Sequence, residues 1–318
     1  MRPTKPTLSP AALSLVLDAL EGTAPATRKA LSEATALGLS TVTRAASVCV
    51  SRGILRYEQS TDPVSGRPCR ILTPTEGLLL PVLTLTRDYG WVRALDMAFI
   101  PVGTATVEFN PTSPPEDRAR LLSRRCLTLL RGCGGAGDVT APVLLVGQGL
   151  PAVILRETVN DTVGTSPLAV LSHGEAVARS MTAKPIPANA ASLLFLSVGK
   201  NTHACLLLRD GDGRWYPSPL GEGLTHTLTK TLSASDASKE GLRRGAAVFL
   251  TDLCRFMRPD LIYIEDPRGA LPDGSVFAPL LPDGVEVVVR PVENDLTVAE
   301  EGAGLIGRRL LWDKILQG

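Results

Sequence analysis

Aromatic side chains are scarce in this chain: 4% of its 318 residues are Phe, Trp or Tyr. Proteins that bind single-stranded nucleic acid stack the bases on exposed aromatic rings, so this scarcity argues against that class. An excess of charge of one sign is also lacking, because 33 Lys and Arg residues face 32 Asp and Glu residues, a formal net charge of +1. This balance excludes a uniformly basic coat, although it leaves room for a local basic surface.

Long apolar runs and paired cysteines are lacking as well. The apolar stretch at 141–155 is broken by Gly, Pro and Gln well before the ~20 residues that a membrane span requires. The first residues contain no long apolar segment of the secretory type. The six cysteines are scattered without a C-x-x-C pair, so neither a zinc site nor a disulfide framework is predicted. These absences predict a protein of the reducing cytoplasm that does not associate with membranes.

The chain does hold enough apolar material for a core, since 44% of its residues are hydrophobic. Its 318 residues predict two or three domains, at about 100–200 residues per domain. A composition change at "TPTEGLLLP" (73–81) suggests that a first domain covers 1–75 and that the remaining chain, 76–318, forms an α/β body.

Three short helices are predicted in the first domain. A proline-initiated helix covers 10–20, and Thr27 caps a second helix, in which three side chains are expected to face inward: Ala30, Leu31 and Ala34. A turn at 36–38 leads to a third helix, 39–51, which ends at Gly53. Two short helices joined by a glycine-bearing turn form the helix-turn-helix pattern.

The third helix has two unequal faces. Its predicted inner stripe is apolar: Val42, Ala45, Ala46, Cys49 and Val50. Its outer face carries short hydrogen-bond donors and one guanidinium: Ser40, Thr43, Arg44 and Ser47. A helix that enters the major groove needs short side chains for close approach and donors for phosphates and base edges. Two strands follow, at 54–59 and 69–74, and the loop between them carries Arg67, which predicts a wing.

These features together resemble the winged helix-turn-helix of repressors in the ROK family (repressor, open reading frame, kinase). The family pattern aligns without a gap at Thr27, Arg28, Leu31, Thr35, Leu37, Ser40, Thr41, Val42, Arg44, Gly53 and Leu55, and its wing G-R-P matches residues 66–68. The sequence departs from the pattern at Ala36 and Gly38, where the family prefers Gly and Ser. The residues expected to contact DNA are Thr27, Arg28, Ser40, Thr41, Thr43, Arg44, Ser47, Arg67 and Arg70. The alternative is a winged helix used for protein contacts.

The body predicts three strands within 82–109, a basic helix at 117–132 and buried strands near 143 and 194. A helix at 241–257 precedes the strand "LIYIED" (261–266), and the last helix is expected after "EEGAGLIG" (300–307). The segments "DLCRFMRPDLIYIED" and "AEEGAGLIGRRLL" resemble signatures of the ROK kinase-like body. That resemblance implies an actin-like (ribonuclease H-like) α/β fold with two lobes, at about 82–185 and 190–318.

The parts that an active sugar kinase of this family needs are eroded. Residues 86–90, "TRDYG", lack the paired glycines of the first phosphate loop, and "GKNTHAC" (199–205) replaces the second. Glu265 and Asp266 replace a Gly-Gly pair that lines the nucleotide, and their charges are expected to repel it. His173 stands where the catalytic aspartate belongs, and the zinc motif is absent. The sequence therefore predicts no catalysis, no cofactor and no metal.

The candidate effector-binding residues are His173 and Glu222, the latter within "PLGEGLTH", which resembles the family's A-G-E-I-G-H. No spacing of His173, His203 and His226 supports a metal site or a nucleophile triad. The prediction is a DNA-binding transcriptional regulator whose body serves dimerisation and sensing. Its expected partners are double-stranded operator DNA, a small-molecule effector such as a sugar, and a second copy of the chain. The alternatives are a divergent ATP-dependent sugar kinase and a scaffold that has lost ligand binding.

Overall fold

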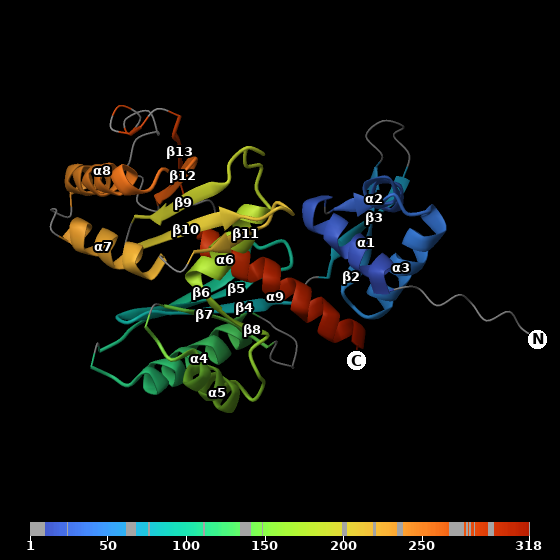
Figure 1. Ribbon diagram of the computed structural model, residues 1–318. Helices are drawn as coiled ribbons and strands as arrows, with labels where there is room; N and C mark the ends of the chain where they lie inside the picture. Colours follow the sequence, from blue (N-terminus) through green and yellow to red (C-terminus); the bar gives the residue numbers. More distant parts are fainter. Residues whose placement is uncertain are drawn as a thin grey trace, which may run out of the picture.

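The fold was analysed in a computed structural model (Figure 1). It describes residues 10–23, 25–61, 68–75, 77–110, 112–133, 141–147, 149–198, 202–218, 221–233, 238–266, 281–282, 284–291 and 296–317, with the single residues 277 and 279. Arg67, the second phosphate loop up to residue 201, and Ser9 lie outside the described residues.

An N-terminal unit combines three helices with a small antiparallel sheet. The helices are α1 (Pro10–Thr23), α2 (Arg28–Thr35) and α3 (Leu39–Ser51), and the strands are β1 (Ala26–Thr27), β2 (Leu55–Thr61) and β3 (Pro68–Pro74). The strand order is β1-β3-β2. The core of the unit gathers side chains from all three helices and from the sheet: Val16, Leu17, Leu20, Leu31, Val42, Ala45, Ala46, Cys49, Ile54, Leu55 and Leu72.

Local signals explain where these helices begin and end. The Thr27 hydroxyl accepts a hydrogen bond from the Ala30 N–H at 3.1 Å and so caps α2. Gly38 caps α3 without a side-chain bond, and Gly53 follows α3 in the left-handed region, with φ at 71°. The expected inward face of α2 was partly wrong, because Ala30 and Ala34 are exposed and only Leu31 is buried. The eight-residue helix reaches the core through this one long side chain.

The body contains two sheets with the same connectivity. The first lobe holds β4 (Leu80–Leu85), β5 (Tyr89–Leu95), β6 (Pro101–Glu108), α4 (Pro115–Gly132), β7 (Val143–Val146), α5 (Ala152–Val163) and β8 (Ala169–Ser172). The second lobe holds β9 (Ser192–Ser197), β10 (His203–Arg209), β11 (Trp215–Pro217), α7 (Gly221–Ser233), α8 (Lys239–Phe256), β12 (Leu261–Asp266) and β13 (Glu286–Pro291).

The strand orders are β6-β5-β4-β7-β8 and β11-β10-β9-β12-β13. In each sheet the first three strands form an antiparallel meander and the last two run parallel to the first. This repeated arrangement confirms the actin-like α/β body that the sequence predicted.

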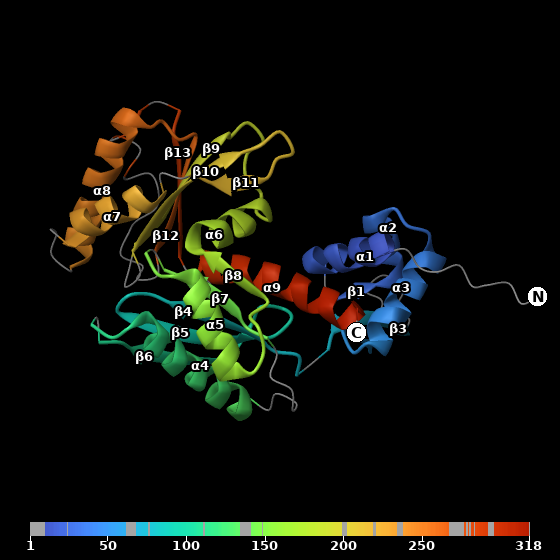
Figure 2. The same ribbon diagram turned by 60° about the horizontal axis from the view of Figure 1, so that its bottom comes forward.

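Two further helices, α6 (His173–Thr182) and α9 (Val298–Gln317), lie between the sheets. They share one continuous core with both lobes, from Leu80 and Val143 on one side to Leu193 and Phe195 on the other. Helices α4 and α5 cover the outer face of the first sheet, and α7 and α8 cover the outer face of the second. Figure 2 shows these layers and the length of α9, which extends from the body to the N-terminal unit.

The prediction that the last helix follows residues 300–307 was wrong, because α9 begins at Val298 and contains that segment. Thr297 and Glu300 form its capping box: the Glu300 N–H donates to the Thr297 hydroxyl at 3.2 Å, and the Glu300 carboxylate accepts from the Thr297 N–H at 2.9 Å. The glycines serve close packing rather than a loop. A Cβ on Gly302 would lie 1.8 Å from the Ala176 carbonyl oxygen of α6.

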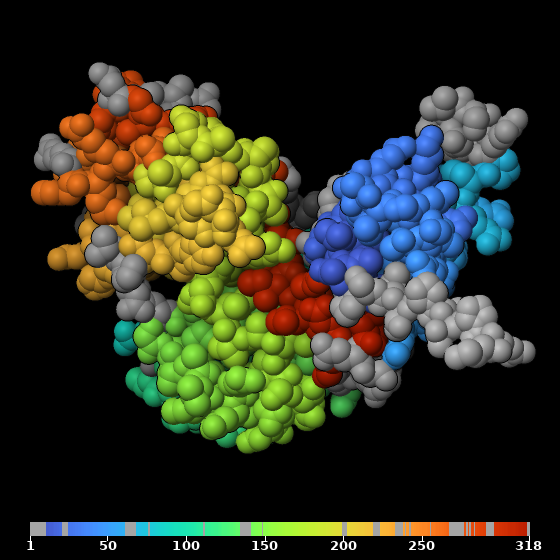
Figure 3. All heavy atoms as spheres, turned by 45° about the vertical axis from the view of Figure 1, so that its right-hand side comes forward, coloured from blue at the N-terminus to red at the C-terminus, as the bar shows by residue number. Residues whose placement is uncertain are grey.

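The far end of α9 packs into the N-terminal unit. Trp312 is buried within the core of that unit, and Ile315 and Leu316 pack against it. Arg309 forms an ion pair with Asp18 of α1 at 2.6 Å. Figure 3 shows α9, in red, lying between the blue N-terminal unit and the green and yellow body. No helix among the described residues has the length and apolarity that crossing a membrane requires.

Candidate functional site

A cavity of about 640 Å³ lies between the two lobes. The first lobe lines it with the ends of β7 and β8 and the starts of α5 and α6, and the second lobe lines it with β10, α7 and the segment after β11. Its described lining is Val146, Gly147, Gly149, Leu150, Ala152, Val170, Leu171, Ser172, His173, Gly174, Glu175, His203, Cys205, Pro217, Ser218 and Thr225. This volume is in the range of about 300–1,000 Å³ that small-molecule sites occupy.

His173 is the first residue of α6 and follows the cap residue Ser172. Its ring hydrogen-bonds to the backbone of Val146, which raises its pKa, and burial outweighs that effect and lowers the pKa below the ordinary 6.5. The imidazole is therefore neutral at neutral pH. The structure thus brings this predicted effector-binding residue into the cavity.

His203 comes from the second lobe and lies against His173, with ring centroids 5.0 Å apart. Burial, followed by the proximity of His173, lowers the pKa of His203 to about 3, so this ring is also neutral. Its Nδ1 lies 3.3 Å from the Thr225 hydroxyl oxygen. Sequence reasoning missed His203 as a site residue because nothing but the pairing of the lobes brings it beside His173.

Glu222 lies in the first turn of α7, and its side chain is outside what the structure describes. His226, one turn further along α7, is exposed. Cys205, beside His203 on β10, is buried, and this burial raises the pKa of its thiol, so the thiol stays protonated. Across the described residues, His, Cys, Asp and Glu side chains nowhere form a group of three or more suited to a metal ion.

The segment "TRDYG" (86–90) forms a closed hairpin between β4 and β5. The Thr86 N–H donates to the Tyr89 carbonyl at 3.0 Å, and the Tyr89 N–H donates to the Thr86 hydroxyl at 3.3 Å. Arg118 from α4 donates to the Arg87 carbonyl at 2.7 Å. Two of the N–H groups that a phosphate cradle would need are therefore already bonded within the turn.

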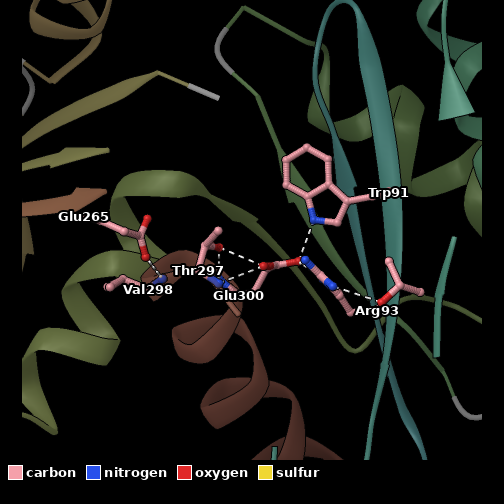
Figure 4. A network of polar contacts seen from close by, with 7 residues as sticks. Trp91, Arg93, Glu265, Thr297, Val298 and Glu300 are labelled. Carbon is pink, nitrogen blue, oxygen red and sulfur yellow. Dashed lines mark hydrogen bonds and ion pairs between the residues drawn. The ribbon is translucent and has the colours of Figure 1, made fainter. Parts of the chain in front are cut away.

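Glu265, at the end of β12, is buried and binds the start of α9 (Figure 4). Its Oε1 accepts a hydrogen bond from the Val298 N–H at 2.5 Å. Burial, as the largest cause, raises the pKa of this carboxyl to about 7. Glu265 was expected to repel a nucleotide; in the structure it lies at the N-terminus of α9, where a carboxylate is favoured by the helix dipole.

Glu300 joins the same region to the first lobe. Its fully buried carboxylate accepts from the Trp91 Nε1–H at 2.5 Å and the Arg93 Nε–H at 3.1 Å, both on β5, and from Thr297 at the cap. Figure 4 shows these side chains converging from β5 and α9. Together, Glu265 and Glu300 attach the first turn of α9 to both sheets.

The N-terminal unit presents the residues predicted to contact DNA. Ser40, Arg44 and Ser47 are exposed on α3 and Arg70 is exposed on β3, whereas Arg28, Thr41 and Thr43 are half-buried, as is the cap residue Thr27. The Ser47 hydroxyl donates to the Thr43 carbonyl at 2.8 Å, within its own helix. Residues 40, 43, 44 and 47 have the spacing that places them along one side of α3. Their role in DNA contact stays a prediction.

Comparisons with known proteins point to one fold. The chain is similar to a solved ROK family transcriptional regulator, described as a homologue of the E. coli Mlc protein, at 14% identity, 96% coverage of this chain, 98% of that chain and a TM-score of 0.59. It is also similar to the ROK hexokinase from Thermus thermophilus (14% identity, 72% and 98% coverage, TM-score 0.45). A third similar structure is a ROK family glucokinase from Streptomyces griseus (13% identity, 73% and 99% coverage, TM-score 0.45).

No protein-family model and no curated protein matches the chain. At these identities the similarity concerns the fold. The resemblance to the ROK family that the sequence predicted is confirmed at that level.

Proposed function

We propose that the chain is a DNA-binding transcriptional regulator. In this proposal residues 1–75 form a winged helix-turn-helix that binds double-stranded DNA, and residues 76–318 form a non-catalytic ROK-like body. The cavity between its lobes, about 82–185 and 190–318, binds a small-molecule effector, and the body mediates dimerisation.

The observation that carries the proposal is the two-faced helix α3. Its buried side chains Val42, Ala45, Ala46 and Cys49 fix it in the N-terminal core. Its exposed side holds Ser40, Arg44 and Ser47, with Thr43 half-buried between them. Short polar side chains around one arginine allow close approach to a base edge, whereas a helix that merely faces solvent more often carries Glu and Lys pairs.

A catalytic body is less well supported. The hairpin at residues 86–90 uses its own N–H groups internally, and Glu265 occupies the start of α9 with a carboxylate where a nucleotide would lie. His173 is a neutral imidazole held by the Val146 backbone. Titration of MgATP by calorimetry separates the alternatives, because a sugar kinase gives saturable heat and the proposed regulator does not.

The proposal is tested by DNA binding with one matched pair of variants. Operator sequences are selected from a random duplex pool, and affinity is measured by fluorescence anisotropy. Arg44→Ala should weaken specific binding by about 1–3 kcal/mol if its guanidinium contacts a base edge. Arg244→Ala, which removes an exposed arginine from α8, should leave the affinity unchanged. Failure to select any sequence, or equal affinity of the Arg44 variant and the parent, would count against the proposal.

A further inference from the structure

The cavity between the lobes has a hydrogen-bonding character that can be worked out atom by atom. The Thr225 hydroxyl donates to the Ala204 carbonyl at 2.7 Å and accepts from the Ala204 N–H at 3.1 Å. Since its only proton is committed to that carbonyl, the contact with His203 Nδ1 requires the ring to be the donor. His203 therefore carries its proton on Nδ1, and its Nε2 is an acceptor.

The Nε2 atom of His203 is buried and has no hydrogen-bond partner among the described residues. A buried acceptor without a partner costs about 1–3 kcal/mol, which a ligand that donates to it would recover. Because burial keeps this ring neutral, the nitrogen keeps its lone pair at physiological pH. The atom thus marks a position where a bound molecule is expected to place an O–H or N–H group.

His173 has the same character from the opposite lobe. The contact with the Val146 backbone raises the pKa of His173, which identifies the Val146 carbonyl as the acceptor and one ring N–H as the donor. The other ring nitrogen is then an acceptor too. Two neutral imidazoles whose centroids are 5.0 Å apart therefore offer two acceptors and no ring donor to the cavity.

The remaining described lining is mostly apolar, with Val146, Leu150, Ala152, Val170, Leu171 and Pro217 as its larger contributors. Its carboxylate, on Glu175, is engaged at the start of α6, where Oε2 accepts from the Ser172 N–H at 2.7 Å and from the Ser172 hydroxyl at 2.8 Å. The described lining contains no Lys or Arg to neutralise an anion. Sugar hydroxyls on all sides of a ring would lose their hydration against these apolar walls without regaining partners.

We propose that this cavity binds an uncharged molecule with an apolar body and two hydrogen-bond donors, one directed at each histidine. The molecule is thus closer to a dihydric phenol than to a sugar or a phosphate ester. This inference builds on the proposed effector-sensing role of the body and specifies the chemistry of the effector.

The test measures binding directly, without DNA, by saturation-transfer NMR titrations of the full chain. The probes are resorcinol, 1,3-difluorobenzene (the same ring without donors), glucose and phenyl phosphate. Resorcinol should bind saturably and at least about tenfold more tightly than each of the other three, as expected for hydrogen bonds made in a buried site. Absence of resorcinol binding at millimolar concentration, or tighter binding of any other probe, overturns the inference.

Two variants connect the binding to the acceptor. His203→Phe keeps a ring but removes the acceptor, and should weaken resorcinol at least about tenfold. His226→Phe makes the same change at an exposed position of α7 outside the cavity lining, and should leave resorcinol binding unchanged. Equal binding of resorcinol to a folded His203→Phe protein overturns the inference. DNA affinity is measured separately, so a failure here leaves the result for Arg44→Ala intact.

Discussion

At the scale of single residues, glycine positions in α9 make a sharp prediction. A Cβ at Gly302 would lie 1.8 Å from the Ala176 carbonyl oxygen and 2.6 Å from the carbonyl carbon, both backbone atoms of α6. Since neither helix can yield locally, Gly302→Ala should separate α6 from α9 and lower the free energy of unfolding by about 3 kcal/mol. Urea denaturation followed by circular dichroism measures this loss.

The matched control is Gly223→Ala in α7, where an added Cβ meets no atom within 4 Å. Alanine favours a helix over glycine by about 1 kcal/mol, so this variant should be as stable as the parent or slightly more stable. If both variants lost stability equally, close packing of α6 on α9 would not explain the effect.

Glu265 gives a residue-level prediction about pH. Its pKa is raised from 4.5 to about 7, first by burial and further by Glu300, against the hydrogen bonds from Val298 and Ser197 and the charge of Lys184. Between these two values the folded chain holds a proton that the unfolded chain has released. The contribution of Glu265 to stability is therefore fully present below pH 4.5 and is lost as the pH rises through about 7.

Glu265→Gln keeps an acceptor for the Val298 N–H but does not ionise. Relative to the parent, this variant should gain stability as the pH is raised from 5 to 8, measured by thermal unfolding at each pH. Glu157→Gln, an exposed position on α5, should follow the parent across the same range. A parallel pH profile for the Glu265 variant and the parent would show that this carboxyl does not titrate in that interval.

At the scale of elements, signals that lie close together in the sequence predicted well. The limits of α3 follow from Gly38, Gly53 and an apolar stripe, all within 16 residues of one another. The glycines of "EEGAGLIG" suggested a loop because glycine disfavours helix interiors. Their real function depends on α6, which is more than a hundred residues away, so local propensity gave the wrong start for α9.

Helix α9 also makes an element-level prediction, since it connects the two parts of the molecule. Trp312, near its end, is 1% exposed and lies in the core of the N-terminal unit. Trp312→Ala should lower stability by about 3–5 kcal/mol, because it removes a large buried side chain and leaves a cavity. Leu310→Ala changes a partly exposed neighbour on the same helix and should cost less than about 1 kcal/mol.

The comparison is made by hydrogen exchange, which reports each part of the chain. Trp312→Ala should increase exchange in α1 and α3 more than in the sheets of the body, because the side chain packs with the former. Uniform acceleration in both parts would indicate that α9 stabilises the chain globally and does not act as a specific connection between them.

At the scale of the whole molecule, the actin-like body was predictable and its cavity was not. Alternating apolar strands and the two ends of the chain carry the fold, and both lobes repeat one strand order. The cavity depends on His173 after β8 meeting His203 at the start of β10, which no spacing in the sequence encodes. Glu222 could be read from the motif, yet its side chain falls outside the described residues.

The last prediction concerns the oligomeric state, which we expect to be a homodimer. The described N-terminal unit offers only a few cations, among them Arg28, Lys29, Arg44, Arg52 and Arg70, and the net charge of the chain is +1. Few phosphate contacts give weak binding that salt readily disrupts, so one such unit is insufficient for operator-level affinity. Two units on a symmetric dimer bind successive half-sites about 34 Å apart, or a multiple of that distance.

Sedimentation velocity at micromolar protein should therefore show a species of twice the 33.6 kDa chain mass, and selected operators should be inverted repeats. Binding to a single half-site should be weaker than binding to the full operator by a factor much larger than two, because the second unit then binds at high effective concentration. Arg44→Ala acts in both units of a dimer, so its cost on the full operator should be about twice its cost on a half-site. A monomer in both the presence and the absence of operator, with equal affinity for half-site and full site, would contradict the dimer and place all of the DNA affinity in one copy of the N-terminal unit.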